Sequence, residues 1–256
     1  MTRQPRIKSQ TGIYHIMFRG INRQNIFEEE RDYQKFMELL INTKQELELK
    51  IFAYCILPNH GHLLMQEKEL GNISTAMHKI LTTFAGWYNR KYLRVGTLFG
   101  NRFNSEPVED DKYLFTLVRY IHQNPWKAGI ANNSHEYKWS SYNEYTGKTE
   151  NIITDTEYLL HFLSVNKKDA INIFVKFHQK TSKDNFDLID TQKITDDQVR
   201  RKIIQLLNGK EPHTLSTMPQ AERNIIIKAL RENEGLSIRQ IERATGVSRG
   251  IISRIK

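Results

Sequence analysis

The sequence contains one cysteine, Cys55, and no long apolar run. A single thiol cannot form an intrachain disulfide, and it excludes a zinc site built from several cysteines. No apolar stretch approaches the length that spans a bilayer, and the N-terminal segment MTRQPRIKSQ lacks the hydrophobic region of a signal peptide. Together these absences favour a cytoplasmic protein, because disulfides are rare in that compartment.

Internal repeats and low-complexity tracts are also missing from the 256 residues, a length that suits one large domain or two smaller ones. The formal net charge is +9, from 38 Lys and Arg against 29 Asp and Glu. Residues 223–256 carry eight basic residues and three acidic ones, a surplus of five in that segment. A basic balance of this kind favours a polyanionic partner, with nucleic acid as the first candidate.

Hydrophobic periodicity predicts alternating strands and helices in the first half of the chain. The strand-like segments are 13–19, 50–57, 61–66 and 105–109. The helix-like segments are 29–49, 72–92 and 110–123, with Asn72 or Ser74 as the N-cap of the second and Asn124-Pro125 as the end of the third. This order is typical of an α+β, ferredoxin-like βαββαβ fold, and we expect one antiparallel sheet with its helices on one face.

The C-terminal segment has a helical pattern of its own. ERNIIIKALRENEG predicts a helix that ends at Gly235, and two short helices follow with Ser237 and Ser248 as N-caps. A short helix, a turn at Gly246-Val247 and a second helix are typical of a helix-turn-helix, whose second helix enters the major groove. A helical hairpin without a DNA role is the alternative. The expected core residues are Ile238, Ile241, Ala244, Val247, Ile251 and Ile252.

The stretch PNHGHLLM contains the residues that are the strongest candidates for a chemical role. His60 and His62 lie two apart at the start of a predicted strand, so extended backbone there projects both imidazoles from one face, where they can share a cation. Tyr120 and Asn124 are one helical turn apart, so Asn124 can add an amide oxygen and Tyr120 a nucleophilic hydroxyl. Such a donor set suits Mg²⁺ or Mn²⁺ holding a phosphate. The alternatives are that His60 and His62 are ordinary polar residues at the start of a strand and that Tyr120 is a core residue.

Four motifs extend this pattern: RGINRQNIF, AYCILPNHGHLLM, YIHQNPWKAGI and KWSSYNEY. Over residues 10–146 the chain resembles the single-tyrosine HUH-type transposases, and within them the REP-associated tyrosine transposases. The resemblance implies that His60, His62 and Asn124 bind Mg²⁺ or Mn²⁺ and that Tyr120 is the nucleophile. It also implies cleavage of single-stranded DNA near hairpins, through a 5′-phosphotyrosine link that frees a 3′-OH. Related transposases can act as homodimers.

Three parts are therefore expected: an HUH nuclease domain at 1–146, connecting helices and a linker at 147–195, and a helical domain with the helix-turn-helix at 196–256. Gly61 departs from the family pattern, which has a bulky hydrophobic residue between the histidines. His122 lies about 200° round the helix from Tyr120, so it is not expected to be a ligand. The basic residues that are candidates for DNA contacts are Arg19, Arg23, Arg90, Lys91, Arg102 and Lys127 near the nuclease site and Arg239, Arg249 and Arg254 in the helix-turn-helix. For each residue near the nuclease site, solvated surface charge is the alternative.

Two other functions remain open from the sequence. The first is a DNA-binding regulator whose HUH domain binds hairpins without cleaving them. The second is a replication initiator or relaxase with the same tyrosine chemistry. The filled active-site positions argue against the first, and the short βαββαβα order argues against the second.

Overall fold

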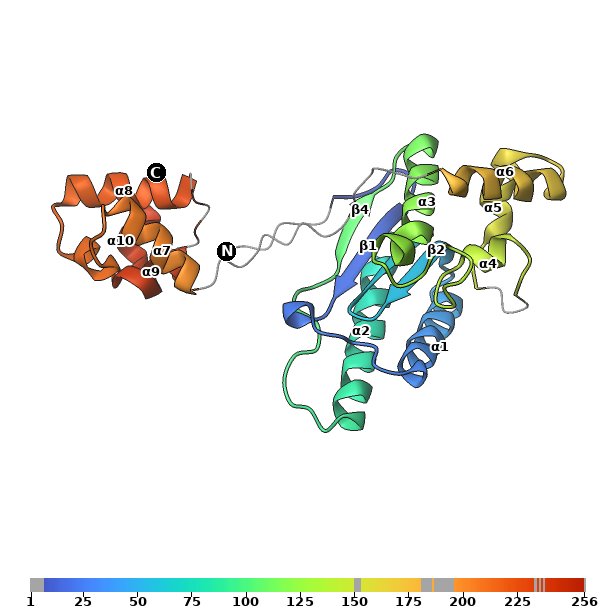
Figure 1. Cartoon of the computed structure of the whole chain (residues 1–256), viewed down its shortest axis with the longest axis horizontal. Coiled ribbons are helices and arrows are strands. Elements are labelled where there is room, and N and C mark those ends of the chain that lie inside the picture. Colours follow the sequence, from blue (N-terminus) through green and yellow to red (C-terminus); the bar gives the residue numbers. More distant parts are fainter. Residues whose placement is uncertain are drawn as a thin grey trace. The chain divides into compact units, whose positions relative to one another are not determined.

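The computed structural model describes residues 7–149, 153–180, 186, 196–232, 234, 236 and 238–255, apart from the side chains of 196–198. The chain divides into two compact units, Met1–Leu188 and Ile189–Lys256, which are described separately (Figure 1). The domain boundaries expected at residues 146 and 195 stay predictions. None of the helices in the described ranges has both the length and the apolar character of a membrane span.

The first unit is built on a four-stranded sheet. Its strands are β1 (Ile13–Arg19), β2 (Lys50–Leu57), β3 (His60–Gln66) and β4 (Asn104–Pro107). The strand order is β2-β3-β1-β4, and each neighbouring pair is antiparallel. β1 and β2 thus run parallel with β3 between them, which is the split βαβ arrangement of a ferredoxin-like sheet. The predicted α+β fold class is confirmed.

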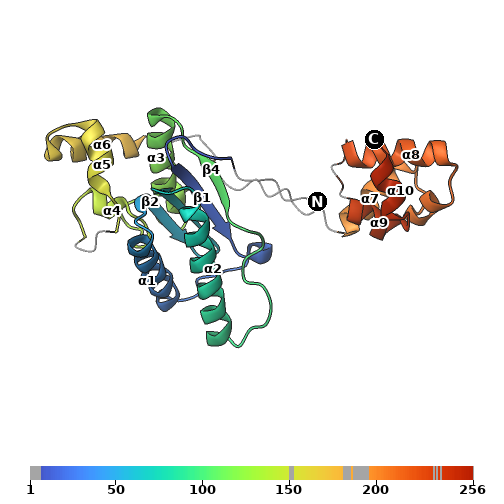
Figure 2. The same ribbon diagram turned by 180° about the vertical axis from the view of Figure 1, so that it is seen from behind.

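Helices cover both faces of this sheet, so the expectation of helices on one face is wrong. The helices α1 (Glu30–Glu46) and α2 (Asn72–Lys91) lie side by side in Figure 1 and Figure 2 and share a core with Phe18 and Leu63. The opposite face, which includes Cys55 and Leu64, packs against α3 (Asp111–Lys127). The physical reason is that β2 and β3 are apolar at nearly every position, as in strands that are buried on both sides.

Helix α2 begins differently from the prediction. Its N-cap is Gly71, not Asn72 or Ser74, and Gly71 has no side chain with which to cap the helix. The carboxylate of Glu67 performs that role, because its Oε2 accepts hydrogen bonds from the backbone N–H groups of Gly71 and Ile73, both at 3.0 Å. A carboxylate brought in from the preceding loop thus satisfies donors that the helix start leaves open.

Helix α3 continues past the residue at which the sequence predicted its end. Asp110 caps its start by accepting a hydrogen bond from the Tyr113 N–H at 2.8 Å. Pro125 lies inside the helix, which ends at Lys127. A proline removes one backbone donor, and in the last turn this loss interrupts few bonds; the Ala128 N–H still reaches the Asn124 carbonyl at 2.9 Å.

Two further helices, α5 (Thr156–Leu163) and α6 (Lys167–Gln179), belong to the same core as α3. They follow the short helix α4 (Tyr142–Tyr145). His122 of α3 lies 3.0 Å from His178 of α6 and 2.8 Å from the Ser141 hydroxyl, all buried. His122 is therefore occupied in the helix packing, away from the histidines of β3, as its position on the helix predicted.

The second unit contains α7 (Asp196–Leu206), the 3-10 turn η2 (Pro212–Ser216), α8 (Gln220–Glu232), α9 (Ile238–Thr245) and α10 (Arg249–Arg254). Ile241, Val247 and Ile252 lie in its core, and Ile238 and Ala244 pack against them, as predicted. Ile251 is wrong as a core residue, since it is 37% exposed. The helix end predicted at Gly235 and the N-cap predicted at Ser237 fall outside the described residues.

Candidate active site

His60 and His62 project from the sheet face that α3 covers. Their partners on β1 are Arg19 and Met17, and the two imidazole rings lie 5.1 Å apart, nearly perpendicular. The Nε2 atoms of both rings are buried. Two nitrogen atoms of the kind that binds divalent transition metals therefore lie on one face of the sheet, His62 buried and His60 half-buried.

Tyr120 lies against this histidine pair. Its ring centroid is 5.6 Å from that of His62, in an edge-to-face arrangement, and only 2% of the residue is exposed. Phe186 contacts the Tyr120 ring edge-on at 5.0 Å, and the Lys127 ammonium lies 4.9 Å from the ring centroid. The sheet and α3 thus bring together the tyrosine and the histidines that the sequence separates by about sixty residues.

Asn124 lies one turn beyond Tyr120 on the same stripe of α3 and is 6% exposed. The described residues form no group of three or more His, Cys, Asp or Glu that could hold a metal ion. Two imidazoles and an amide oxygen are a smaller donor set, which leaves positions for water or phosphate oxygens. This chemistry fits Mg²⁺ or Mn²⁺ with a bound phosphate rather than a closed structural zinc site.

The electrostatics of the site favour a neutral imidazole at His62. Burial lowers the pKa of His62 well below its ordinary value, and the neighbouring charges of His15, His60 and Arg19 lower it further. A neutral imidazole is the form that binds a metal, because the ligand nitrogen must carry a lone pair. His62 is thus in the ligand-competent form at neutral pH.

Two residues beside the histidines were not singled out by the sequence analysis. His15 of β1 is fully buried, and its Nε2 lies 3.1 Å from Nδ1 of His62. Asn59 precedes β3, and its Oδ1 lies 2.5 Å from Nδ1 of His60. The available signal for His15 was strand alternation, since it shares a face of β1 with Met17, the partner of His62.

Gly61 points to the opposite face of the sheet, where α1 and α2 pack. A Cβ atom at this position would lie 2.3 Å from Cζ of Phe18, the residue opposite Gly61 on β1. The ring of Phe18 therefore occupies the volume that a bulky residue between the histidines would need. The departure from the family pattern concerns packing, and both histidines keep their places on the α3 face.

Comparisons with known proteins agree with this fold and these motifs. The model of the IS200-like transposase family matches residues 8–124. A protein of Haemophilus influenzae assigned as a REP-associated tyrosine transposase is 30% identical over 122 residues, which cover 43% of this chain and 69% of the relative. The chain belongs to the REP-associated tyrosine transposases. Members of this family cleave and join DNA, so the transposase is an enzyme, and the family predicted from the motifs is confirmed.

A solved structure of a REP-associated tyrosine transposase bound to a REP hairpin has the same fold. It matches the transposase described here with a TM-score of 0.50 and 19% sequence identity, over 60% of this chain and 94% of that chain. At this identity the likeness concerns the fold. The roles of His60, His62, Tyr120 and Asn124 stay predictions.

The basic residues predicted near the site of the transposase divide into two groups. Arg19 lies opposite His60 on β1, and Lys127 lies over Tyr120. Arg23 and Arg102 are exposed on loops, Arg23 in the turn that follows β1 and Arg102 just before β4. These four residues remain candidates for phosphate contacts.

Arg90 and Lys91 belong to α2, which covers the opposite face of the sheet, so the structure contradicts their placement near the site. Lys91 forms ion pairs with Glu29, at 2.5 Å, and with the buried Asp32 of α1. Its ammonium also lies 5.0 Å from the Trp87 ring centroid. Lys91 therefore joins α1 to α2.

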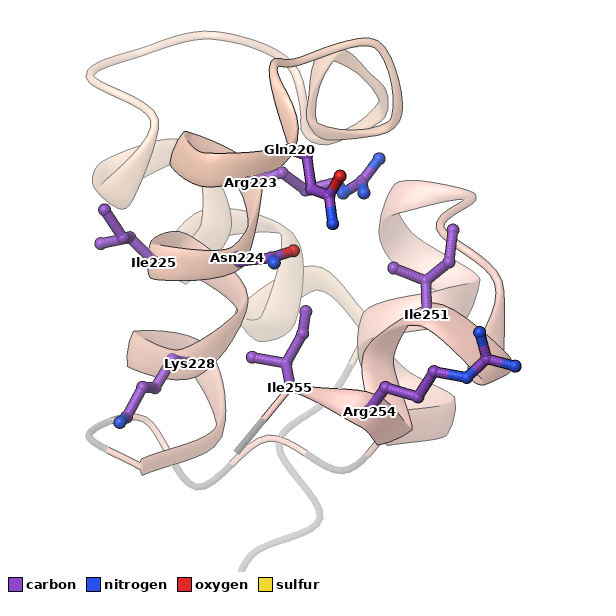
Figure 3. A pocket seen from close by; sticks show the side chains of 8 residues that line it. All are labelled: Gln220, Arg223, Asn224, Ile225, Lys228, Ile251, Arg254 and Ile255. Carbon is purple, nitrogen blue, oxygen red and sulfur yellow. The ribbon is translucent and has the colours of Figure 1, made fainter.

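The second unit of the transposase carries a basic groove between α8 and α10, with a volume of about 530 Å³. Its cationic side chains are Arg223, Lys228 and Arg254, and Figure 3 shows Gln220 and Asn224 of α8 directed toward α10. Arg239 and Arg254 are exposed, whereas Arg249 is ion-paired with Glu242 on the neighbouring helix. Of the three predicted DNA contacts in this unit, Arg249 is thus the one engaged within the fold.

Proposed function

We propose that the protein is a Mg²⁺- or Mn²⁺-dependent endonuclease and strand transferase for single-stranded or hairpin DNA, and that Tyr120 is its covalent nucleophile. The observation that carries the proposal is the edge-to-face contact of Tyr120 with His62, on the face from which His60 also projects. A tyrosine beside a pair of imidazoles that can hold a metal ion suits phosphodiester cleavage, in which a hydroxyl attacks a held phosphate.

In the proposed step the phenolic oxygen of Tyr120 attacks the scissile phosphorus. A bond forms between phosphorus and the tyrosine oxygen, and the bond to the 3′ oxygen breaks. The tyrosine proton leaves, and the departing 3′ oxygen takes up a proton. The product is a 5′-phosphotyrosine link and a free 3′-OH, so a later attack by a 3′-OH rejoins strands without ATP.

His60, His62 and Asn124 would hold the divalent ion, which when bound would polarise the scissile phosphate and stabilise its developing charge. Arg19 and Lys127 lie beside this centre and are suited to neighbouring phosphates. The solved relative bound to a REP hairpin supports a hairpin as the class of substrate.

The decisive experiment is an adduct assay with a labelled hairpin oligonucleotide and Mn²⁺. We expect the wild-type protein to form a covalent complex that survives denaturing electrophoresis. Tyr120→Phe should abolish it, because the substitution removes only the attacking oxygen. The matched control is Tyr113→Phe, which changes the other tyrosine of α3 and should leave adduct formation intact.

Two results would contradict the proposal. An adduct that persists in Tyr120→Phe would assign the nucleophile elsewhere. Binding of hairpins without cleavage, with every divalent ion tried, would identify a hairpin-binding regulator. His60→Ala and His62→Ala should also lose adduct formation, and their unchanged activity would contradict the metal assignment.

We also propose that the second unit binds duplex DNA near the target, as a helix-turn-helix formed by α9 and α10. The exposed Arg239 and Arg254 and the basic groove beside α10 support this proposal. Phosphates are the natural partners of such a surface. A homodimer is a further proposal that comes from the family resemblance alone.

A further inference from the structure

Two hydrogen bonds support the imidazoles of the proposed metal site. His60 Nδ1 lies 2.5 Å from Asn59 Oδ1, and His62 Nδ1 lies 3.1 Å from His15 Nε2. Both bonds engage Nδ1. With Nδ1 engaged in each ring, a metal ion would be bound through Nε2, and Nε2 of both rings is buried.

The orientation of the Asn59 amide follows from its second bond. Its Nδ2 donates to the backbone carbonyl of Arg23 at 3.3 Å. A carbonyl accepts and cannot donate, so Nδ2 must face Arg23 and Oδ1 must face His60. An amide oxygen at His60 Nδ1 requires the proton on that nitrogen, which leaves the lone pair on Nε2. Asn59 thus selects the tautomer of His60 that can bind a metal.

Asn59 is itself held by the loop that follows β1. The Gly20 N–H donates to the Asn59 carbonyl at 2.9 Å, and the N–H groups of Ile26 and Phe27 both donate to the Pro58 carbonyl, at 2.8 and 3.0 Å. A Cβ atom at Gly20 would lie 2.3 Å from the Gln24 carbonyl oxygen, so the tight loop requires glycine there. The motif RGINRQNIF therefore forms a clamp around the turn before the histidines.

His15 has the corresponding relation to His62. The two rings are nearly parallel, with their centroids 5.3 Å apart, and His15 is fully buried. If Nε2 of His62 binds the metal, its Nδ1 carries the proton and donates to Nε2 of His15. His15 is not a third ligand in this arrangement, because its Nε2 faces the Nδ1 side of His62.

We propose that His15 and Asn59 are positioning residues, which fix the tautomer and ring orientation of His62 and His60 so that both Nε2 atoms face one divalent ion. This inference rests on the proposed metal site. Outer bonds of this kind orient metal-binding histidines, and their removal typically weakens metal binding by roughly 10- to 100-fold.

The test measures Mn²⁺ binding to the full-length protein by EPR titration, without DNA and without activity. We expect His15→Leu and Asn59→Ala to weaken Mn²⁺ binding by roughly 10- to 100-fold. His15→Gln keeps an acceptor at the same place and should restore most of the affinity, whereas Asn59→Asp keeps the Oδ1 acceptor but loses the bond from Nδ2 to the Arg23 carbonyl and should restore a part of it. Pulsed EPR should detect two coordinated imidazole nitrogens in the wild type and a reduced nitrogen signal in His15→Leu.

Two control variants separate positioning from general loss of structure. His178→Leu removes another buried imidazole that is bonded to a histidine at 3.0 Å, away from the site. Asn89→Ala removes another side-chain amide that holds a loop carbonyl, that of Gly96 at 2.9 Å. Both should bind Mn²⁺ as the wild type does. Circular dichroism will establish that each variant is folded before its affinity is compared.

The possible failures are distinguishable. If wild-type protein shows no nitrogen-coordinated Mn²⁺, or if His60→Ala and His62→Ala bind it unchanged, the metal assignment itself is overturned, together with this inference. If the wild type binds Mn²⁺ through these histidines but folded His15→Leu and Asn59→Ala bind it equally well, the positioning role alone is overturned. A loss that neither conservative variant restores would also overturn it.

Discussion

Gly61 lies where β3 must place two histidines on one face of the sheet and pack closely on the other. Its neighbours His60 and His62 face α3, while Gly61 faces the aromatic core formed with α1 and α2. There the Phe18 ring stacks on Phe36 at 5.0 Å and fills the space above the glycine. The Phe18 ring of β1 thus fills the volume that a side chain at position 61 of β3 would occupy.

Gly61→Ala should destabilise the protein by about 1–3 kcal/mol, the usual cost of overpacking. The added Cβ would lie 2.3 and 2.7 Å from two atoms of the Phe18 ring, so the ring must move. Urea unfolding of the variant measures the loss. Gly86→Ala is the matched control, because its Cβ would meet nothing closer than 3.7 Å and it lies within α2; it should stabilise the helix slightly.

A double-mutant cycle tests the cause. Phe18→Leu shortens the side chain that fills the space, so Gly61→Ala should cost less in that background than in the wild type. The two changes touch the same volume, and neighbouring substitutions of this kind are non-additive. Strict additivity would show that the Phe18 ring is not what requires glycine at position 61.

At the scale of elements, α3 carries the predicted nucleophile on one stripe and packs against α6 with another. One stripe carries Tyr120 and Asn124, while His122 points toward α6 and bonds to His178. His178 Nδ1 donates to the Phe174 carbonyl at 2.9 Å, so its Nε2 accepts from His122. Both imidazoles are neutral in this chain of bonds, which ties α3 to α6.

The pair predicts a pH dependence of stability. Burial lowers the pKa of His178 from 6.5 to about 4 and lowers that of His122 well below 6.5. Below pH 6.5 the unfolded chain therefore binds more protons than the folded chain, so the free energy of unfolding falls as pH falls from 6.5 toward 4. The His178 shift corresponds to a loss on the order of 3 kcal/mol, at roughly 1.4 kcal/mol per pKa unit.

Chemical denaturation at several pH values measures this effect. His178→Gln cannot titrate, so its free energy of unfolding should vary less steeply between pH 6.5 and 4. Gln179→Ala on the same helix provides the control, because neither the glutamine nor the alanine side chain titrates and the slope should stay as in the wild type. An undiminished slope in His178→Gln would assign the acid sensitivity to other groups.

At the scale of the whole molecule, the protein has a second candidate surface for DNA, the basic surface of the second unit, in addition to the candidate active site of the first unit. If it binds duplex DNA, Arg239→Ala and Arg254→Ala should each weaken binding at low salt. Each should also reduce the slope of log K against log salt by about 0.9 for a lost phosphate contact. Adduct formation with a hairpin should remain, because it depends on the first unit.

Filter binding over a range of salt concentrations provides the measurement. Arg200→Ala is the control, since Arg200 is exposed but paired with Glu211 at 2.8 Å in the same unit. We expect its salt slope to match that of the wild type. Unchanged slopes for both Arg239→Ala and Arg254→Ala would mean that this face does not bind DNA phosphates.

Local sequence pattern was sufficient to predict several strands, the family and the faces shared by the candidate site residues. The hydrophobic pattern predicted β1 and β2 at their observed limits, and the motif order predicted the family. The shared face of His60 and His62 follows from alternation alone, because it is a property of any extended strand. The helical stripe of Tyr120 and Asn124 is local in the same way.

Only the tertiary structure decided what lies across the sheet. Continuous apolar strands do not say which helix covers which face, so α1 and α2 on one side and α3 on the other emerged from packing. The same holds for His15 and Asn59, whose bonds to His62 and His60 depend on strand register and on a loop clamp. The sequence determined which residues are predicted to carry the chemistry, because those patterns are local, and long-range packing decided which residues lie against them.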